Sequence, residues 1–240
     1  MRAMILAAGL GTRLRPLTND RPKALVEING RTLLEIALTR LRAFGIRDVI
    51  INVHHFADMV IDYLQAKHSF GMRLEISRED VLLDTGGGLK KAAHFFLEDK
   101  LEEPFLLHNV DVISSIDLRR MVQFHLENRA LATLAVQERE TSRYLLFDNQ
   151  LQLCGRRSIG DPEDEVVRPA PELRALAFCG IHVLSREIFA QLTEEGVFSI
   201  IPAYLRLAGQ AEKIVGFRAD EYSWRDLGKL DSMRQASEKS

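Results

Sequence analysis

The amino-acid sequence predicts an α/β fold in which helices cover both faces of a mostly parallel sheet. The main observation is that short β-branched runs alternate with longer segments whose apolar residues recur at helical spacing. A second observation is size, because 240 residues of which 46% are hydrophobic can bury a sizeable core. No linker or internal repeat divides the chain, so we predict a single domain over residues 1–240.

The first half of the chain supplies most of this pattern. We expect strands at residues 4–8, 49–53, 73–77, 104–110 and 131–136, and helices at 33–44, 57–66, 89–96 and 118–127. Ligands of parallel sheets bind at the carboxyl ends of the strands. The loops after Ala7, Ser77 and Val110 are therefore where we look for chemistry.

The second half of the chain has a different character. RYLLFDNQLQLCG, residues 143–155, contains two strand-like runs around Asp148-Asn149, which predicts a hairpin. Residues 155–172 are polar and contain three prolines, so we expect a loop there. A long strand at 176–185, a helix at 200–207, a strand at 212–217 and a closing helix at 227–236 complete the chain.

Charge and cysteine content exclude several classes of function. The formal net charge of −2 and the lack of like-charge blocks argue against nucleic acid or an anionic membrane as a partner. Cys154 and Cys179 form neither a disulfide framework nor a zinc motif. No leader-like start and no run of about 18 apolar residues is present, so we expect a cytoplasmic protein.

The stretch AMILAAGLGTRLRPLT, residues 3–18, passes from a strand into glycines and arginines. It lacks the Gly-Lys-Ser/Thr of a Walker A loop, and Leu14 stands where a dinucleotide fingerprint needs a small residue. What remains is a loop of exposed backbone N–H groups, to which Arg13 and Lys23 add positive charge suited to a polyphosphate. An ordinary loop with surface arginines is the alternative.

The combination L-A-A-G-x-G-T-R-x-x-P-x-T followed by P-K resembles the signature loop of the sugar-1-phosphate nucleotidylyltransferases. That resemblance implies a Rossmann-like three-layer fold with a small β-rich sugar-binding insertion. It also implies that the loop wraps a nucleoside triphosphate, through Ala7, Ala8, Gly9, Gly11, Thr12, Arg13 and Lys23. By the same resemblance, residues 1–135 form the nucleotide-binding part and 136–240 the sugar-binding part, without a C-terminal β-helix.

A second glycine segment, LDTGGG at residues 83–88, lies between a predicted strand and helix. Three glycines there leave room for a flat ring against the backbone, although a turn with Asp84 or Thr85 as helix cap is equally consistent. The resemblance places this segment against the nucleobase and ribose, through Thr85, Gly86 and Gly87. Arg78 and Glu79 just upstream are candidates for recognition of the base.

Two aspartates are the candidate metal ligands. Asp111 follows the strand PFLLHNV, and Asp226 lies in WRDLG. Each is compatible with a turn or cap role, but the family binds its metal with an aspartate after this strand and with a W-x-D-x-G motif. The resemblance therefore implies Mg²⁺ on Asp111 and Asp226, with Arg13 and Lys23 as the other catalytic residues.

The contacts to the sugar are less completely marked. The resemblance assigns Asn109 and Gly180 to the sugar, but the family's Glu-Lys-Pro segment, whose lysine holds the sugar phosphate, is absent. Arg156 and Arg157 are candidates for that phosphate. Adjacent His54 and His55 point to opposite sides of an extended chain and are not expected to bind a metal.

The implied reaction is transfer of a nucleoside monophosphate from an NTP to a sugar 1-phosphate, releasing pyrophosphate. Stretches such as LLDTGGGLKKA and TSRYLLFD resemble a subgroup described as uridylyltransferases for N-acetylmuramate 1-phosphate or guanylyltransferases for mannose 1-phosphate. We favour the first, with the second as the alternative. A cytidylyltransferase for a small phosphorylated alcohol and a non-catalytic nucleotide-sugar sensor stay open, as does the choice between monomer and dimer.

Overall fold

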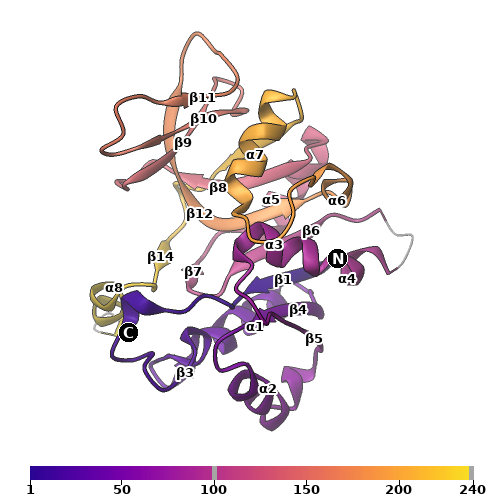
Figure 1. The fold of residues 1–240 in the computed structure, drawn as a ribbon, viewed down its shortest axis with the longest axis vertical. Helices are drawn as coiled ribbons and strands as arrows, with labels where there is room; N and C mark the ends of the chain where they lie inside the picture. Colours follow the sequence, from indigo (N-terminus) through magenta and orange to yellow (C-terminus); the bar gives the residue numbers. More distant parts are fainter. Residues whose placement is uncertain (99–101, 238–240) are drawn as a thin grey trace.

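The computed structural model describes residues 1–98 and 102–237, and it contains a ten-stranded mixed sheet with helices on both faces (Figure 1). Four parallel strands make up one half, in the spatial order β5 (Arg73–Arg78), β4 (Asp48–Val53), β1 (Arg2–Leu6) and β6 (Phe105–Asn109). The predicted fold class is confirmed.

The long strand β12 (Arg174–Leu184) joins this parallel half to an antiparallel extension. One end of β12 pairs antiparallel with β6, and its other end pairs with β9 (Arg143–Phe147). The sheet then continues through β10 (Leu153–Ser158) to the short edge strand β11 (Glu165–Val166). On its other side β12 pairs with β8 (Ala132–Gln137), which pairs in parallel with β13 (Ile214–Arg218).

The inner parallel strands β1, β4 and β6 carry apolar residues on both faces, because each face is covered by helices. Ala3 and Ile5 of β1 face one core while Met4 faces the other, as the two-residue period of a strand requires. The first core is covered by α1 (Leu33–Ala43), α2 (Ala57–Ala66) and α5 (Leu118–Asn128). The second is covered by α3 (Asp84–Lys91), α4 (Ala93–Leu97), α6 (Ile188–Gln191) and α7 (Ile200–Gly209).

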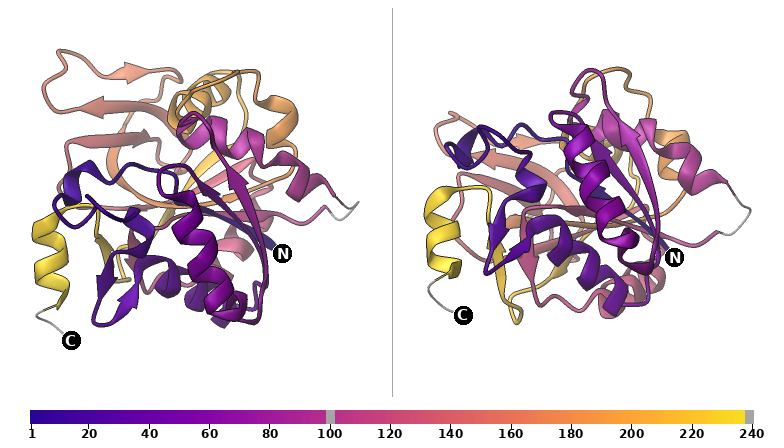
Figure 2. Two further views of the ribbon diagram at one scale, coloured as in Figure 1. Left: turned by 60° about the horizontal axis from the view of Figure 1, so that its bottom comes forward. Right: turned by 90° about the horizontal axis from the view of Figure 1, so that it is seen from below.

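The remaining elements are short, and several of them lie near the carboxyl edge of the parallel strands. Two small antiparallel pairs are β2 (Glu27–Ile28) with β3 (Arg31–Thr32), and β7 (Val112–Ser114) with the distant β14 (Trp224–Asp226). Single turns of 3-10 helix occur at η1 (Thr12–Leu14), η2 (Lys23–Leu25) and η3 (His68–Gly71). The last helix, α8 (Leu230–Ser237), packs beside β2, so the chain end returns to the N-terminal loops (Figure 2).

Three sequence-based expectations need correction. The helix expected at 89–96 begins at Asp84 and is divided into α3 and α4 around Ala92. The loop expected at 155–172 contains the end of β10 and the strand β11, because their ladder hydrogen bonds supply order that proline content obscures. The closing helix expected from residue 227 begins at Leu230, because residues 224–226 pair with β7. No helix in the described ranges is long and apolar enough to cross a membrane.

Candidate active site

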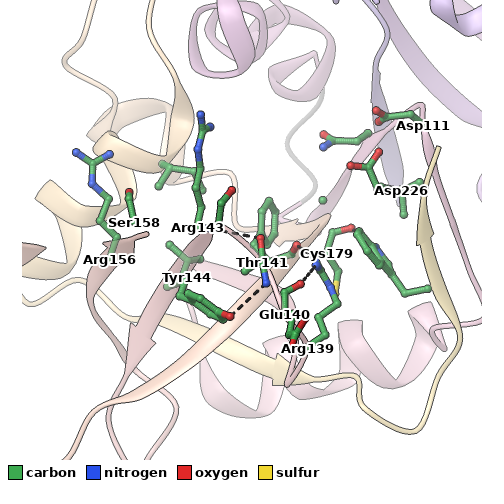
Figure 3. Close-up of a pocket in the computed structure, with 18 of the residues that line it drawn as sticks. Asp111, Arg139, Glu140, Thr141, Arg143, Tyr144, Arg156, Ser158, Cys179 and Asp226 are labelled. Atoms are coloured by element: carbon green, nitrogen blue, oxygen red, sulfur yellow. Dashed lines mark hydrogen bonds between the residues drawn. The ribbon is translucent and has the colours of Figure 1, made fainter. Parts of the chain in front are cut away.

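A large cleft separates the carboxyl edge of the parallel strands from the antiparallel extension. Its volume is about 1290 Å³. One end is lined by residues that follow β1, β6 and β14, and the other by β9, β10 and the segment joining β8 to β9. Figure 3 shows Asp111 and Asp226 together at one side of the cleft, and Arg143, Tyr144 and Arg156 along the strands opposite.

The first glycine loop is held at both of its ends. Where β1 stops, the Ala7 backbone N–H donates to Asn52 Oδ1 at 2.8 Å. Further on, Thr18 Oγ1 donates to the Gly11 carbonyl oxygen at 2.9 Å. Gly11 has a φ of +65°, and a Cβ there would lie 3.0 Å from Thr18 Cγ2, so this turn requires glycine. These two hydrogen bonds and the left-handed turn at Gly11 therefore define the conformation of the loop.

Lys23 lies underneath this loop. Its Nζ forms an ion pair with Asp111 Oδ2 at 2.8 Å, and the side chains are only 15% and 9% exposed. A Cβ at Gly9 would lie 3.9 Å from the same Nζ, so the loop backbone passes close to the lysine. Burial of both charges makes them mutually dependent, because loss of either leaves the other uncompensated.

Asp226 reaches Asp111 through the pairing of β14 with β7. The register places Asp226 opposite Val112, and the Leu227 N–H donates to the Asp111 carbonyl oxygen at 2.8 Å. Asp226 Oδ1 itself accepts a hydrogen bond from the Gly228 N–H at 2.7 Å. Two carboxylates that are far apart in the chain therefore lie at one point of the cleft.

Gly228 is the centre of this arrangement. A Cβ on it would lie 2.8 Å from Asp111 Oδ2, 2.8 Å from Asp226 Oδ1 and 2.9 Å from Arg13 Nη2. The structure therefore brings together the four predicted catalytic residues, Arg13, Lys23, Asp111 and Asp226. Gly228 was not among the predicted site residues, although its place in W-x-D-x-G was visible in the sequence.

The second glycine segment lies inside a helix and is packed against protein. Gly86 and Gly87 both donate their N–H groups to the Phe198 carbonyl oxygen, at 2.9 and 3.2 Å. A Cβ on Gly86 would lie 2.3 Å from the Phe198 ring, and one on Gly87 2.4 Å from the Gly196 carbonyl oxygen. On this side of α3 the absence of side chains is therefore used for close packing against protein. A nucleotide contact by either glycine stays a prediction.

Thr85 caps a different helix from its own. Its Oγ1 accepts a hydrogen bond from the Ile200 N–H at 2.9 Å, the first N–H of α7, while Ser199 makes no side-chain cap there. The neighbouring Asp84 lines the cleft and accepts from the Thr85 N–H at 2.6 Å. A ligand contact by Thr85 stays a prediction beside this structural role.

Glu79 and Arg78 lie on either side of the point where β5 ends. Glu79 is only 2% exposed and accepts hydrogen bonds from Asn52 Nδ2 at 2.7 Å and from the Leu83 N–H at 2.9 Å. Arg78 is exposed and pairs with Asp58 at 2.7 Å. Neither is among the residues that line the cleft, and a base contact by either stays a prediction.

Asn52 was missed by the sequence analysis. Because it binds both Ala7 and Glu79, it connects the two loops that bear the glycine segments. A polar residue near the end of the apolar strand VIINV was the available signal. Its amide can satisfy a donor and an acceptor at once, which an apolar residue in β4 could not do.

Asn109 and Gly180 meet at the border between the two halves of the cleft. Gly180 has a φ of +71°, and a Cβ there would lie 2.7 Å from Asn109 Nδ2. Beside them, Trp224 Nε1 donates to the Cys179 carbonyl oxygen at 2.8 Å. Burial raises the pKa of the Cys179 thiol to about 12, so this side chain is a neutral packing group rather than a nucleophile.

Several arginines occupy the opposite end of the cleft. Arg156 and Arg157 line it as expected, but each is paired, with Glu165 at 2.6 Å and with Asp164 at 2.7 Å. Nearer the border, Arg139 was missed, and it lies with its Cζ 3.8 Å from the centre of the Trp224 ring. The absence of a Glu-Lys-Pro segment therefore does not leave this end without cations.

Asp111 and Asp226 would supply few protein ligands to a metal ion. Among the residues the structure describes, no cluster of three or more His, Cys, Asp or Glu side chains could hold a metal ion. Two carboxylates at one point nevertheless suit Mg²⁺, which is usually held by one or two carboxylates together with phosphate oxygens and water. The donor set fits a cation that arrives with a phosphate substrate.

These features together define a class of protein. A glycine loop after the first strand of a parallel sheet is typical of nucleotide-binding α/β proteins. Cations beneath that loop, facing two carboxylates, are typical of sites that transfer phosphoryl or nucleotidyl groups. The fold and site therefore define a nucleotide-binding α/β enzyme.

Comparison with known proteins agrees with this class. The chain belongs to the nucleotidyl transferase family, whose model matches residues 2–240. It is 37% identical to an N-acetylmuramate alpha-1-phosphate uridylyltransferase of Caulobacter vibrioides over 238 residues, covering 94% of this chain and 91% of that protein. It is 34% identical to a mannose-1-phosphate guanyltransferase of Yarrowia lipolytica over 146 residues, covering 60% of this chain and 40% of that protein.

A solved structure gives the same fold. A putative glucose-1-phosphate thymidylyltransferase from Bacillus anthracis matches 99% of this chain and 94% of its own, with a TM-score of 0.80 and 18% identity. At that identity the likeness concerns the fold alone. The prediction of membership in the nucleotidyltransferase family, and hence of a transferase, is confirmed.

Proposed function

We propose that this protein transfers uridylyl groups from UTP to N-acetylmuramate 1-phosphate in a magnesium-dependent reaction. The observation that carries the transfer chemistry is the meeting of Arg13, Asp111 and Asp226 around Gly228, with Lys23 paired to Asp111. The choice of substrates is supported by the similarity to the Caulobacter vibrioides uridylyltransferase, which extends over 94% of this chain.

The proposed reaction needs no general base. An oxygen of the sugar 1-phosphate is already anionic and forms a bond to the α-phosphorus of UTP, while the bond from that phosphorus to the pyrophosphate oxygen breaks. Arg13 and the N–H groups of the loop orient the triphosphate, and they stabilise the charge that develops on the leaving pyrophosphate. Catalysis by these residues consists of positioning and charge stabilisation.

Lys23 has two successive partners in this proposal. Without ligand it neutralises Asp111 at 2.8 Å. When phosphates enter, its flexible ammonium group can turn to an oxygen of the triphosphate, which releases Asp111. Asp111 and Asp226 would then hold Mg²⁺, which supplies positive charge at the phosphate oxygens when bound.

The decisive experiment measures pyrophosphate release by the purified protein with Mg²⁺. UTP, GTP, CTP and dTTP are each tested with N-acetylmuramate, N-acetylglucosamine, glucose and mannose 1-phosphates. We expect the highest kcat/KM for UTP with N-acetylmuramate 1-phosphate, loss of activity with EDTA, and recovery with added Mg²⁺. Turnover near normal for Asp226→Asn would contradict the proposed metal role.

A second candidate is guanylyl transfer to mannose 1-phosphate. It is favoured by the similarity to the Yarrowia lipolytica guanyltransferase, which covers 60% of this chain. Preference for GTP and mannose 1-phosphate in the same assay would establish it in place of the first. If no pair of substrates gives pyrophosphate release but calorimetry detects nucleotide binding, the result would instead support a binding protein.

A further inference from the structure

Arg139 is a cation that the fold holds rigidly in the cleft. It lies between β8 and β9, and its guanidinium covers the Trp224 ring with Cζ 3.8 Å from the ring centre. Arg139 Nη2 donates to the Phe178 carbonyl oxygen of β12 at 2.8 Å. Stacking and hydrogen bonding together restrict a side chain that would otherwise be flexible, so its charge is preorganised.

This charge has no carboxylate partner among the residues the structure describes. Arg156 and Arg157, which line the cleft, are paired with Glu165 and Asp164, and Lys23 near it is paired with Asp111. Besides the Trp224 ring and the neutral Cys179 thiol, Arg139 contacts the carbonyl oxygens of Glu140 and Phe178, and its Nε is buried without a hydrogen-bond partner. A half-buried guanidinium that lines the cleft without a carboxylate partner is free to bind an anion that enters, which favours a ligand here.

The position of Arg139 indicates which part of a ligand it meets. It lies beside Cys179 and Glu140, apart from Asp111 and Asp226 (Figure 3). The Phe178 carbonyl that it binds belongs to the strand segment that leads to Gly180, the residue facing Asn109. In the proposed function, the negative charge of the triphosphate is met elsewhere, by Arg13 and Lys23. An anionic group here would therefore belong to the sugar.

We propose that Arg139 is a specificity-determining residue that binds a carboxylate on the sugar of the acceptor. The proposal rests on the proposed function and names its substrate class, sugar 1-phosphates with an acidic substituent. The lactyl ether of N-acetylmuramate carries such a carboxylate, whereas N-acetylglucosamine has a hydroxyl group at the same place. A guanidinium presents parallel N–H donors that match a carboxylate, so the acidic sugar gains charge-assisted hydrogen bonds that the neutral one lacks.

Arg143 is the competing residue. It lines the cleft, is exposed, and makes no side-chain ion pair within the described ranges. Unlike Arg139 it is not stacked on a ring, so holding a ligand would cost it more side-chain entropy. This difference in preorganisation is why we assign the carboxylate to Arg139.

The test compares kcat/KM for N-acetylmuramate 1-phosphate and N-acetylglucosamine 1-phosphate, with saturating UTP and Mg²⁺. We expect the wild type to prefer the acidic sugar. Arg139→Met should lower kcat/KM for that sugar by roughly 10-fold or more, mainly through KM, while changing the neutral sugar by less than about 3-fold. Arg139→Lys, which keeps the charge without the fork, should restore part of the preference.

The matched control is Arg120→Met. Arg120 also lies over an aromatic ring, with Cζ 6.0 Å from the centre of Tyr222, but it is not among the residues that line the cleft. Arg120→Met should leave the ratio of kcat/KM for the two sugar 1-phosphates unchanged. If Arg139→Met does not fold, the methyl ester of the lactyl group, tested on the wild type, removes the same charge interaction and should behave as the neutral sugar does.

Several outcomes would overturn the assignment. An equal loss with both sugars in Arg139→Met would place the guanidinium on the shared 1-phosphate or make it purely structural. Collapse of the ratio in Arg143→Met alone would transfer the role to Arg143. Equal use of both sugars by the wild type would refute recognition of the carboxylate but leave nucleotidyl transfer intact. Inactivity of the wild type with both sugars would refute the proposed function and, with it, this inference.

Discussion

The two glycine segments look alike in the sequence but differ in what approaches their backbones. In the first, Gly11 adopts a left-handed φ of +65° in a loop that closes over Lys23. In the second, Gly86 and Gly87 are helical residues of α3, and their missing side chains make room for Phe198 and Gly196. A glycine in a sequence therefore indicates an unusual backbone conformation or close packing, and only the fold shows which of the two applies.

We therefore expect substitutions in the two glycine segments to change different properties of the protein, turnover for the first and stability for the second. Substitutions beneath the first segment should change the reaction because charged groups face the cleft there. Substitutions in the second should change the free energy of unfolding, because the segment supports α7 and the strands behind it. The following predictions test that division, beginning with the largest expected effect.

Lys23→Met should lower kcat by about 100-fold or more, since it removes a positioned charge from the phosphates. It also leaves Asp111, only 9% exposed, without its ion-pair partner, so some stability should be lost as well. Steady-state kinetics at a temperature where melting curves show folded protein measures the first effect by itself. Wild-type turnover in this variant would remove Lys23 from the catalytic residues.

Gly228→Ala should reduce kcat by about 10-fold or more. The added methyl group would lie 2.8 Å from carboxylate oxygens of both Asp111 and Asp226, so the pair must separate. Gly209→Ala, at the end of α7, is the control, because a Cβ there meets nothing closer than 3.4 Å. Equal and small effects of the two changes would show that Gly228 does not shape the site.

Gly86→Ala should destabilise the fold by about 1–3 kcal/mol with little effect on kcat, because its Cβ would lie 2.3 Å from the Phe198 ring. Urea unfolding gives the free energy, and kinetics on folded protein gives kcat. Adding Phe198→Leu should relieve part of the overlap, so the two changes should be non-additive. Simple additivity would mean that Phe198 is not what Gly86 accommodates.

Acid should weaken the support behind the second segment through His182. Nδ1 of the His182 ring is hydrogen-bonded to the Tyr204 hydroxyl group of α7 at 2.9 Å. Burial lowers the pKa of His182 to about 3. The unfolded chain binds a proton below its ordinary pKa of about 6.5 while the native ring stays neutral, so stability falls as pH decreases from about 6.5 towards 3. His108 and His125, whose pKa values burial lowers to about 4, contribute in the same direction. His182→Gln should therefore reduce the slope in urea unfolding measured at successive pH values, and an unchanged slope would contradict this.

Thr85→Ala should have the smallest effect, a loss of about 1 kcal/mol, because it removes the hydroxyl that caps α7 at Ile200. Thr85→Ser keeps the hydroxyl and should retain most of the stability. Melting curves check both variants. A large rise in the KM for nucleotide without loss of stability would instead show that Thr85 contacts the ligand.

Much of this architecture could be predicted from local pattern. The inner parallel strands β1, β4 and β6 have apolar residues at both odd and even positions, which is why they were expected close to where they occur. The short strands β7 and β14 were not expected, since three residues have no detectable period of their own. Their order comes from pairing with each other.

The α/β alternation, the glycine loop after β1 and the residue types of the candidate active site can be read from the sequence, because periodicity and motif spacing are local properties of the chain. Which of those residues meet depends on the folded structure. Pairing of β14 with β7 brings Asp226 to Asp111, and packing of the segment after β8 against β14 lays Arg139 on Trp224. Such contacts depend on how distant segments pack together, and no local pattern specifies them.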